Sequence, residues 1–187
     1  METLLGLVIG IGLSAACGFR VFVPLLGMSI ATMAGYLTLS PGFQWIGSWP
    51  AFIAFSTATI LEMAAYYIPW LDHVMDMITT PAAVVAGAMV TASMMGEMNP
   101  LLKWSLAIIA GGGTAGLVQA GTVMLRGASS TTTGGIGNVL VSTGEMIGSI
   151  VTTLLALMIP VLCLFVVAFL VFFIIWRAIR PQNKHAA

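Results

Sequence analysis

The stretch Asn138-Val-Leu-Val-Ser142-Thr-Gly-Glu145-Met-Ile-Gly-Ser149-Ile-Val-Thr152 is the most informative part of this sequence. Its polar residues follow one another in steps of four, three, four and three. Such steps place residues on one face of an α-helix, so the stretch predicts an apolar helix with a single polar stripe. An ionisable residue among aliphatic neighbours is costly to bury, and inside a membrane it indicates a functional site.

A second polar stripe comes earlier in the chain, at Ser56, Thr59, Glu62 and Tyr66. It also carries a glutamate, although the chain contains only 6 acidic residues. We interpret the two stripes as the path of a small solute or ion. The residues expected to line this path are Arg20, Glu62, Tyr66, Asn138, Ser142, Glu145 and Ser149.

The composition excludes several classes of protein. Of 187 residues, 59% are hydrophobic and 6% are charged, whereas a soluble domain carries roughly a quarter charged residues. The chain is therefore predicted to be an all-α, polytopic membrane protein with one transmembrane domain over 1–187. Its 6 basic residues offer no surface for nucleic acid. Without a Walker loop, an HExxH motif or a nucleophile–base arrangement, we expect neither an enzyme nor a cofactor.

The first apolar run, residues 4–39, is too long for one straight helix. It would extend about 54 Å, while the hydrocarbon core is roughly 30 Å thick. We therefore expect two segments, 4–17 and 21–39, that meet near Gly18 and Arg20, and the run either crosses once or folds back. Arg20 should then point inward, where a carboxylate could neutralise it.

The remaining boundaries follow prolines, glycines and polar residues. The run 138–176 should kink or turn at Pro160. The chain is thus predicted to have about six helical segments, two of them broken or re-entrant. The other expected elements are a turn at 40–50, spans over 51–69, 82–98 (begun by Pro81) and 101–126, a short interfacial piece at 70–78 and a polar loop at 129–138.

The two halves of the chain, 4–98 and 101–179, contain similar features in the same order. Each has an early arginine, Arg20 or Arg126, then a helix with a glutamate, then a segment begun by proline. Three segments per half predict an inverted repeat, with a site between the halves. Glycine-rich faces suit association between helices, so a homodimer is expected.

Two further groups of residues are weaker candidates for sites. Arg126, Gly134 and Gly135 lie before a helix start, where backbone N–H groups could bind an anion or a lipid headgroup; the alternative is a flexible solvent loop. Asp72, His73 and Asp76 could ligate a divalent metal, but a solvated polar face is the stronger interpretation, so no metal site is predicted.

Three stretches together resemble a known family. They are Gly18-Phe19-Arg20-Val-Phe-Val-Pro24-Leu-Leu, then Glu62 with Tyr66-Tyr67-Ile-Pro69-Trp-Leu-Asp72, then Thr133-Gly134-Gly135-Ile-Gly137-Asn138 with Ser142 and Glu145. In this order they resemble a bacterial membrane family known as domain of unknown function 4126, over residues 4 to 160. The resemblance implies an integral inner-membrane protein and no particular substrate. The residues it marks are Arg20, Glu62, Asp72, Asn138 and Glu145.

Two functions are consistent with these features. The first is a transporter or channel for a small solute or ion that uses Glu62 and Glu145, with Arg20 as counter-charge. The second is a membrane scaffold or lipid-binding subunit in which the glutamates form structural ion pairs with Arg20 and Arg126. Half of the basic residues fall within the short tail 177–187, which predicts a cytoplasmic C-terminus.

Overall fold

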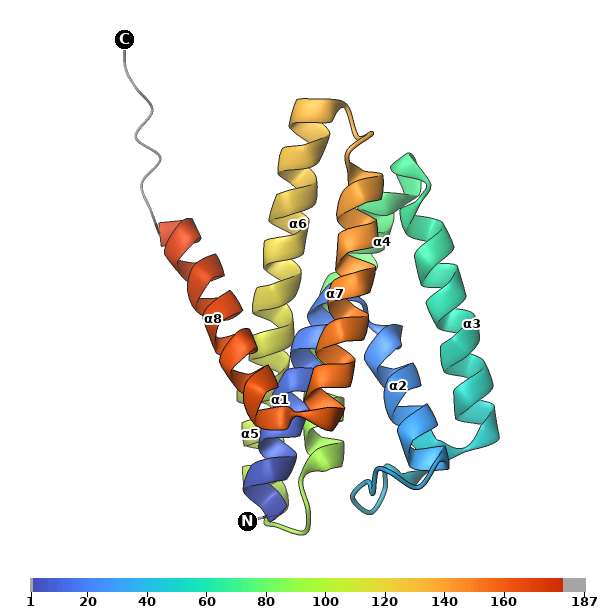
Figure 1. Cartoon of the computed structure of the whole chain (residues 1–187), viewed down its shortest axis with the longest axis vertical. Coiled ribbons are helices and arrows are strands. Elements are labelled where there is room, and N and C mark those ends of the chain that lie inside the picture. The colour runs from blue at the N-terminus through green and yellow to red at the C-terminus, as the bar shows by residue number, and fades with distance from the viewer. Residues whose placement is uncertain (1, 180–187) are drawn as a thin grey trace.

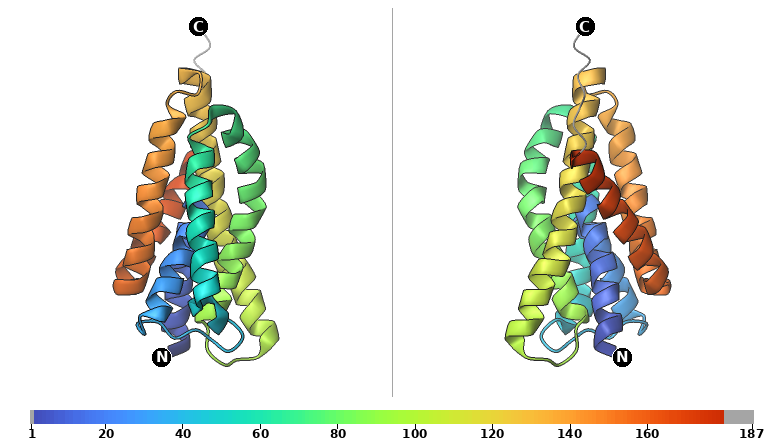
Figure 2. Two further views of the ribbon diagram at one scale, coloured as in Figure 1. Left: turned by 90° about the vertical axis from the view of Figure 1, so that its right-hand side faces the viewer. Right: turned by 90° about the vertical axis from the view of Figure 1, so that its left-hand side faces the viewer.

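The computed structural model describes residues 2–179, apart from the side chains of Glu2, Pro69, Trp70, Asp72, His73 and Ala178. Helices make up nearly all of this range, and they gather in one elongated bundle (Figures 1 and 2). They are α1 (Glu2–Phe19), α2 (Phe22–Met33), the 3₁₀ turn η1 (Gln44–Gly47), α3 (Trp49–Tyr66), α4 (Pro69–Met94), α5 (Pro100–Leu106), the π-helical segment η2 (Ala107–Gly112), α6 (Gly113–Thr133), α7 (Asn138–Met158) and α8 (Pro160–Ile179).

Four of the described helices are long and apolar enough to cross a membrane. They cover Val74–Met94, Pro100–Thr133, Asn138–Met158 and Pro160–Arg177. The second of these is α5, η2 and α6 running without interruption, so the described chain forms seven helices, close to the expected six. The all-α prediction is confirmed.

The run 4–39 is broken where the sequence indicated. Helix α1 ends at Phe19, α2 begins at Phe22, and Arg20 lies between them outside either helix. Figure 1 shows α1 rising from the end of the bundle marked N, and α2 returning toward that same end. The two helices therefore form a hairpin that turns halfway along the bundle. We call the end at which α1 begins the lower end, and the opposite end the upper end.

The prediction of a separate interfacial piece at 70–78 is wrong. Helix α4 runs from Pro69 to Met94 with Pro81 inside it. Proline removes one backbone hydrogen bond, but a membrane helix tolerates this because its neighbours support it. The buried residues Thr79 and Ala83 on either side of Pro81 show that packing holds the helix here.

The polar loop expected at 129–138 is also shorter than predicted. Helix α6 continues to Thr133, because hydroxyl groups in its last turn bond back to helix carbonyls: Thr133 Oγ1 donates to Ser129 O at 2.7 Å. Glycine then ends the helix, since Gly134 adopts a left-handed conformation with φ 63°. The connection to α7 is consequently a tight turn.

Small residues let α1, α4 and η2 approach closely. A Cβ atom added to Gly111 would lie 2.2 Å from Thr91 Oγ1 and 2.6 Å from Gly87 O. Helix α1 also packs against α6, α7 and α8, which makes it the centre of the bundle. The glycines of η2 thus allow close packing between helices of this chain. From the sequence, glycine-rich faces were expected to contact a second copy.

The halves 4–98 and 101–179 begin at the same end of the bundle. Figure 1 shows both α1 and α5 starting at the lower end. An inverted repeat requires the second half to start at the opposite end. As divided here, the halves do not run in opposite directions. Helix α8 leans away from the others, and Phe165, Phe169 and Phe172 are more than half exposed.

Candidate functional site

The polar stripe of α7 is buried along its whole length. Asn138, Ser142, Glu145, Ser149 and Thr152 are each 9% exposed or less. On α3, Thr59, Glu62 and Tyr66 are buried in the same way, while Ser56 is half-buried. Both stripes therefore face the interior of the bundle, as the helical spacing predicted.

Glu145 is the anionic centre of a buried charge cluster. Its Oε1 accepts a hydrogen bond from Arg126 Nε at 2.9 Å, and its Oε2 lies 2.9 Å from Arg126 Nη2. Arg20 Nη2 lies 3.3 Å from the same Oε2 and donates to the backbone oxygen of Ser142 at 3.0 Å. The expected inward-pointing Arg20 with a carboxylate partner is thus present. One carboxylate connects the α1–α2 turn, α6 and α7.

The ring of Tyr66 contacts both arginines. The guanidinium carbons of Arg20 and Arg126 are 3.9 and 4.3 Å from the centre of its ring. A cation over an aromatic face is attracted by the ring quadrupole, more strongly where water is excluded. The phenol oxygen of Tyr66 lies 2.8 Å from Thr79 Oγ1 and donates to Asp76 at 3.3 Å. Tyr66 therefore contacts both cations with its ring and anchors α3 to α4 with its hydroxyl group.

Asp76 connects the cluster to its surroundings. Its carboxylate pairs with Arg126 Nη1, and its side chain is 17% exposed, compared with 2 to 3% for Arg126 and Glu145. Asp76 lies near the start of α4, toward the upper end of the bundle. Asp76 is therefore the most exposed charged side chain of the cluster.

Glu62 has a different role from Glu145. Its carboxylate accepts the backbone N–H groups of Val21 at 3.0 Å and Phe22 at 3.3 Å. The first N–H groups of a helix lack partners within the helix, and a carboxylate satisfies them and complements the helix dipole. Glu62 is thus a cap supplied by α3 to the start of α2. It stabilises the break beside Arg20.

Several buried polar atoms near the cluster have no hydrogen-bond partner among the described residues. Arg20 Nε and Nη1 are two of them, although Arg20 is only 2% exposed. They also include the hydroxyl oxygens of Ser29 and Thr32 on α2, Thr59 on α3, and Ser142 and Thr153 on α7. Because α2 and α7 pack together and both run toward the lower end, these groups continue the polar stripe away from the cluster.

The structure separates the residues of the expected anion site. Arg126 is turned inward to Glu145 and Asp76, while Gly134 is exposed at the upper turn and Gly135 is half-buried there. Asn138 Nδ2 donates to Ser130 Oγ at 2.9 Å. Ser149 is also separate from the cluster, since its hydroxyl donates to Ala16 O at 3.0 Å. The described residues therefore do not assemble Arg126 and the glycines into one site.

The weak metal candidates are only partly described. The side chains of Asp72 and His73 lie outside the described residues, and Asp76 contacts Arg126 and Tyr66. No group of three or more metal-ligating side chains occurs in the part of the chain searched.

Sequence reasoning missed Asp76 as a cluster member and missed the polar side chains of α6. Gln119 Nε2 donates to Thr79 Oγ1 at 3.2 Å and so extends the network. A signal was present, because Gln119, Thr122 and Arg126 follow steps of three and four, and all three are buried.

The fold and the cluster define a helical membrane protein with ionisable side chains gathered inside its bundle. The family model described as Domain of unknown function (DUF4126) matches residues 7–180, and the chain belongs to this family. The motif resemblance is thereby confirmed. Searches of curated proteins and of solved structures found no match.

Proposed function

We propose that this protein moves a small solute or ion across the membrane, with Arg20, Glu62 and Glu145 in the pathway. The observation that carries the proposal is the row of buried polar atoms without partners, from Arg20 along α2 and α7. A buried polar group left unsatisfied costs free energy, so its presence needs an explanation such as transient contact with water or a passing solute. The row extends from the charge cluster toward the lower end.

The broken helix supports the same proposal. Secondary transporters commonly bind their substrate where a membrane helix is interrupted, because the freed backbone groups and the helix dipole face the site. Here the Glu62 carboxylate accepts hydrogen bonds from the free N–H groups at the start of α2. Arg20 lies in the interruption between α1 and α2. The α1–α2 hairpin would then be re-entrant in the membrane, since irregular backbone at membrane depth is tolerated where protein surrounds it.

The second candidate function is a membrane scaffold. The observation in its favour is that Glu145 is bound by both arginines and Glu62 by two backbone N–H groups. In a scaffold these contacts hold the helices together and never open. In a transporter they open during each cycle.

Solute flux in proteoliposomes distinguishes the two functions. A pH-sensitive dye and a panel of ion and solute gradients would be applied to wild type, Glu62→Gln and Glu145→Gln. Thr153→Val tests the row below the cluster, because it removes one unpartnered hydroxyl and leaves the charges intact. Thr57→Val, on the exposed side of α3, is its matched control.

The transport proposal expects flux in wild type and in Thr57→Val, and reduced flux in the other variants at equal folded amounts. Arg177→Gln removes an exposed charge from α8 and is the control for charge loss. Absence of flux under every gradient, with Glu62→Gln and Glu145→Gln lowering only stability, would favour the scaffold.

We further propose that the protein is a non-enzymatic, homodimeric component of the bacterial inner membrane with a cytoplasmic C-terminus. The exposed phenylalanines of α8 supply an apolar face for lipid or a second copy. Arg177, together with basic residues beyond the described range, supports the orientation. Cross-linking in native membranes tests the dimer, and a reporter fused to the C-terminus tests the orientation.

A further inference from the structure

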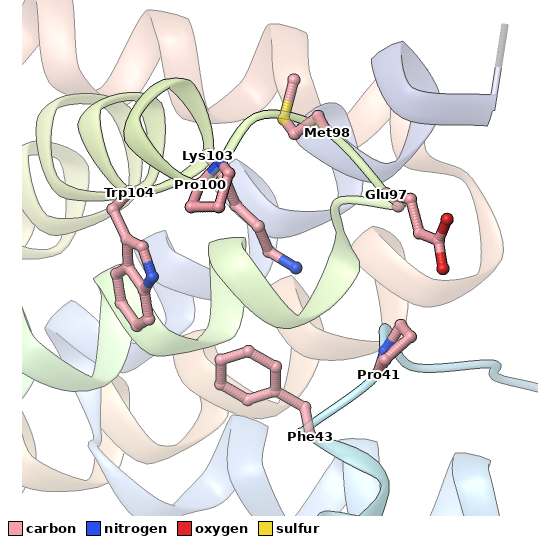
Figure 3. A pocket seen from close by; sticks show the side chains of 8 residues that line it. Pro41, Phe43, Glu97, Met98, Pro100, Lys103 and Trp104 are labelled. Atoms are coloured by element: carbon pink, nitrogen blue, oxygen red, sulfur yellow. The ribbon is translucent and has the colours of Figure 1, made fainter.

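A separate cavity opens at the lower end of the bundle, away from the charge cluster. It has a volume of about 550 Å³ and lies between the loop after α2, the loop after α4 and the first turns of α5. Figure 3 shows Lys103 and Glu97 among its lining side chains, together with the rings of Phe43 and Trp104. The cavity thus offers one cation, one anion and two aromatic surfaces.

Lys103 has unused capacity to bind an anion. Its ammonium group donates to Ser40 Oγ at 2.8 Å, which occupies one of its three donors. The ion pairs found among the described residues all involve Arg20 or Arg126, so Lys103 has no carboxylate partner there. Its ammonium nitrogen is 5.7 Å from the centre of the Phe43 ring, and both residues line the cavity.

The surroundings of the cavity match a membrane–water interface. Trp104 lines it and is 43% exposed, while Trp45 and Trp49 are exposed on neighbouring elements of the same end. Tryptophan is enriched at headgroup level in membrane proteins. Leu101 and Leu102 beside the cavity are 76% and 56% exposed, and they provide an apolar surface along which acyl chains can lie.

We propose that this cavity binds a phospholipid with an amine-bearing zwitterionic headgroup, whose phosphate contacts Lys103 and whose ammonium contacts Glu97. The opposite charges of the two side chains complement the two charges of the headgroup. Phe43 and Trp104 provide aromatic faces for the ammonium and the glycerol region. This inference is independent of the proposed transport, since no residue of the charge cluster lines the cavity.

Native mass spectrometry of the delipidated full chain, titrated with phosphatidylethanolamine, tests the proposal. Lys103→Gln is expected to weaken binding about tenfold or more, because hydrogen bonds to charged groups are the strongest polar contacts available here. Gly96→Leu adds a bulky side chain at the cavity lining and is expected to do the same. It needs no backbone change, since a Cβ atom on Gly96 meets nothing within 4 Å.

Two matched controls accompany these variants. Gly127→Leu adds the same side chain at an exposed glycine of α6 that is also surrounded by open space. Arg177→Gln removes one exposed positive charge elsewhere. Both should bind phosphatidylethanolamine like wild type, within about twofold. Gly96→Leu keeps the proposal testable if Lys103→Gln does not fold.

The headgroup chemistry is tested with two further ligands. Phosphatidylglycerol lacks the amine, so wild type should bind it more weakly than phosphatidylethanolamine, and Glu97→Gln should abolish that preference. Equal binding of both lipids by wild type overturns the role of Glu97. Unchanged binding in Gly96→Leu and Lys103→Gln overturns the site. Soluble phosphoethanolamine that binds as tightly as the lipid would identify a soluble ligand and overturn the lipid assignment.

Discussion

Arg126 holds Glu145 at two points, with Nε 2.9 Å from Oε1 and Nη2 2.9 Å from Oε2. A guanidinium fork against a carboxylate is among the strongest charged contacts in proteins. Because the two residues lie on α6 and α7, the pair fixes these helices below their tight connection. Arg20 reaches the same carboxylate from the α1–α2 turn, so Glu145 joins this turn to α6 and α7.

Arg126→Met is expected to destabilise the protein by about 3–5 kcal/mol, because it leaves a buried carboxylate with too little positive charge. The double variant Arg126→Met with Glu145→Met should lose less stability than the sum of the losses in the two single variants. In the double variant, neither Arg126 nor Glu145 remains buried without the other. Reversible unfolding in detergent measures all three. Additive losses would show that the pair contributes no coupling.

Glu62→Ala should loosen the start of α2, because the N–H groups of Val21 and Phe22 lose their acceptor. Hydrogen exchange of these two amides is expected to accelerate relative to wild type. Removing a helix cap costs about 0.5–2 kcal/mol, so the fold should survive. Ser56→Ala, on the same helix, is the control and should leave this exchange unchanged. If the amides of Val21 and Phe22 exchange as slowly in Glu62→Ala as in wild type, the cap is dispensable.

Tyr66 is expected to act mainly through its ring. Tyr66→Phe removes the hydroxyl contacts with Thr79 and Asp76 and should cost about 1 kcal/mol. Tyr66→Leu also removes the ring that contacts Arg20 and Arg126, and should cost about 1–2 kcal/mol more. Thermal unfolding of the two variants under one detergent condition gives the comparison. A loss in Tyr66→Leu no greater than that in Tyr66→Phe would assign the role to the hydroxyl.

Two glycines close together in sequence should respond in opposite ways to alanine. Gly111→Ala places a methyl group against Thr91 and the Gly87 carbonyl, so α4 and η2 must separate, and a loss of stability is expected. At Gly113 a Cβ atom meets nothing within 4 Å, so Gly113→Ala should be neutral or stabilising by about 0.5–1 kcal/mol. Melting temperatures measured side by side test the contrast.

The local features of the chain were predictable because they depend on spacing and composition. Apolar runs too long for one helix predicted the interruption near Arg20 and the division at Pro160. The stripe through Glu145 predicted its buried face, since helical periodicity acts within a single element. The errors at Pro81 and at 129–133 arose where tertiary packing and hydroxyl-to-carbonyl bonds continued helices through residues that usually end them.

From its own periodicity and composition, the sequence determined the membrane class, the helical segments and the buried polar faces. Only the tertiary structure decided which charges meet. Glu62 and Glu145 have similar positions in their stripes, yet one caps α2 and the other pairs with two arginines. Partner choice depends on how separate helices lie against one another. That arrangement results from packing among elements that are distant in the chain, and local sequence periodicity cannot predict it.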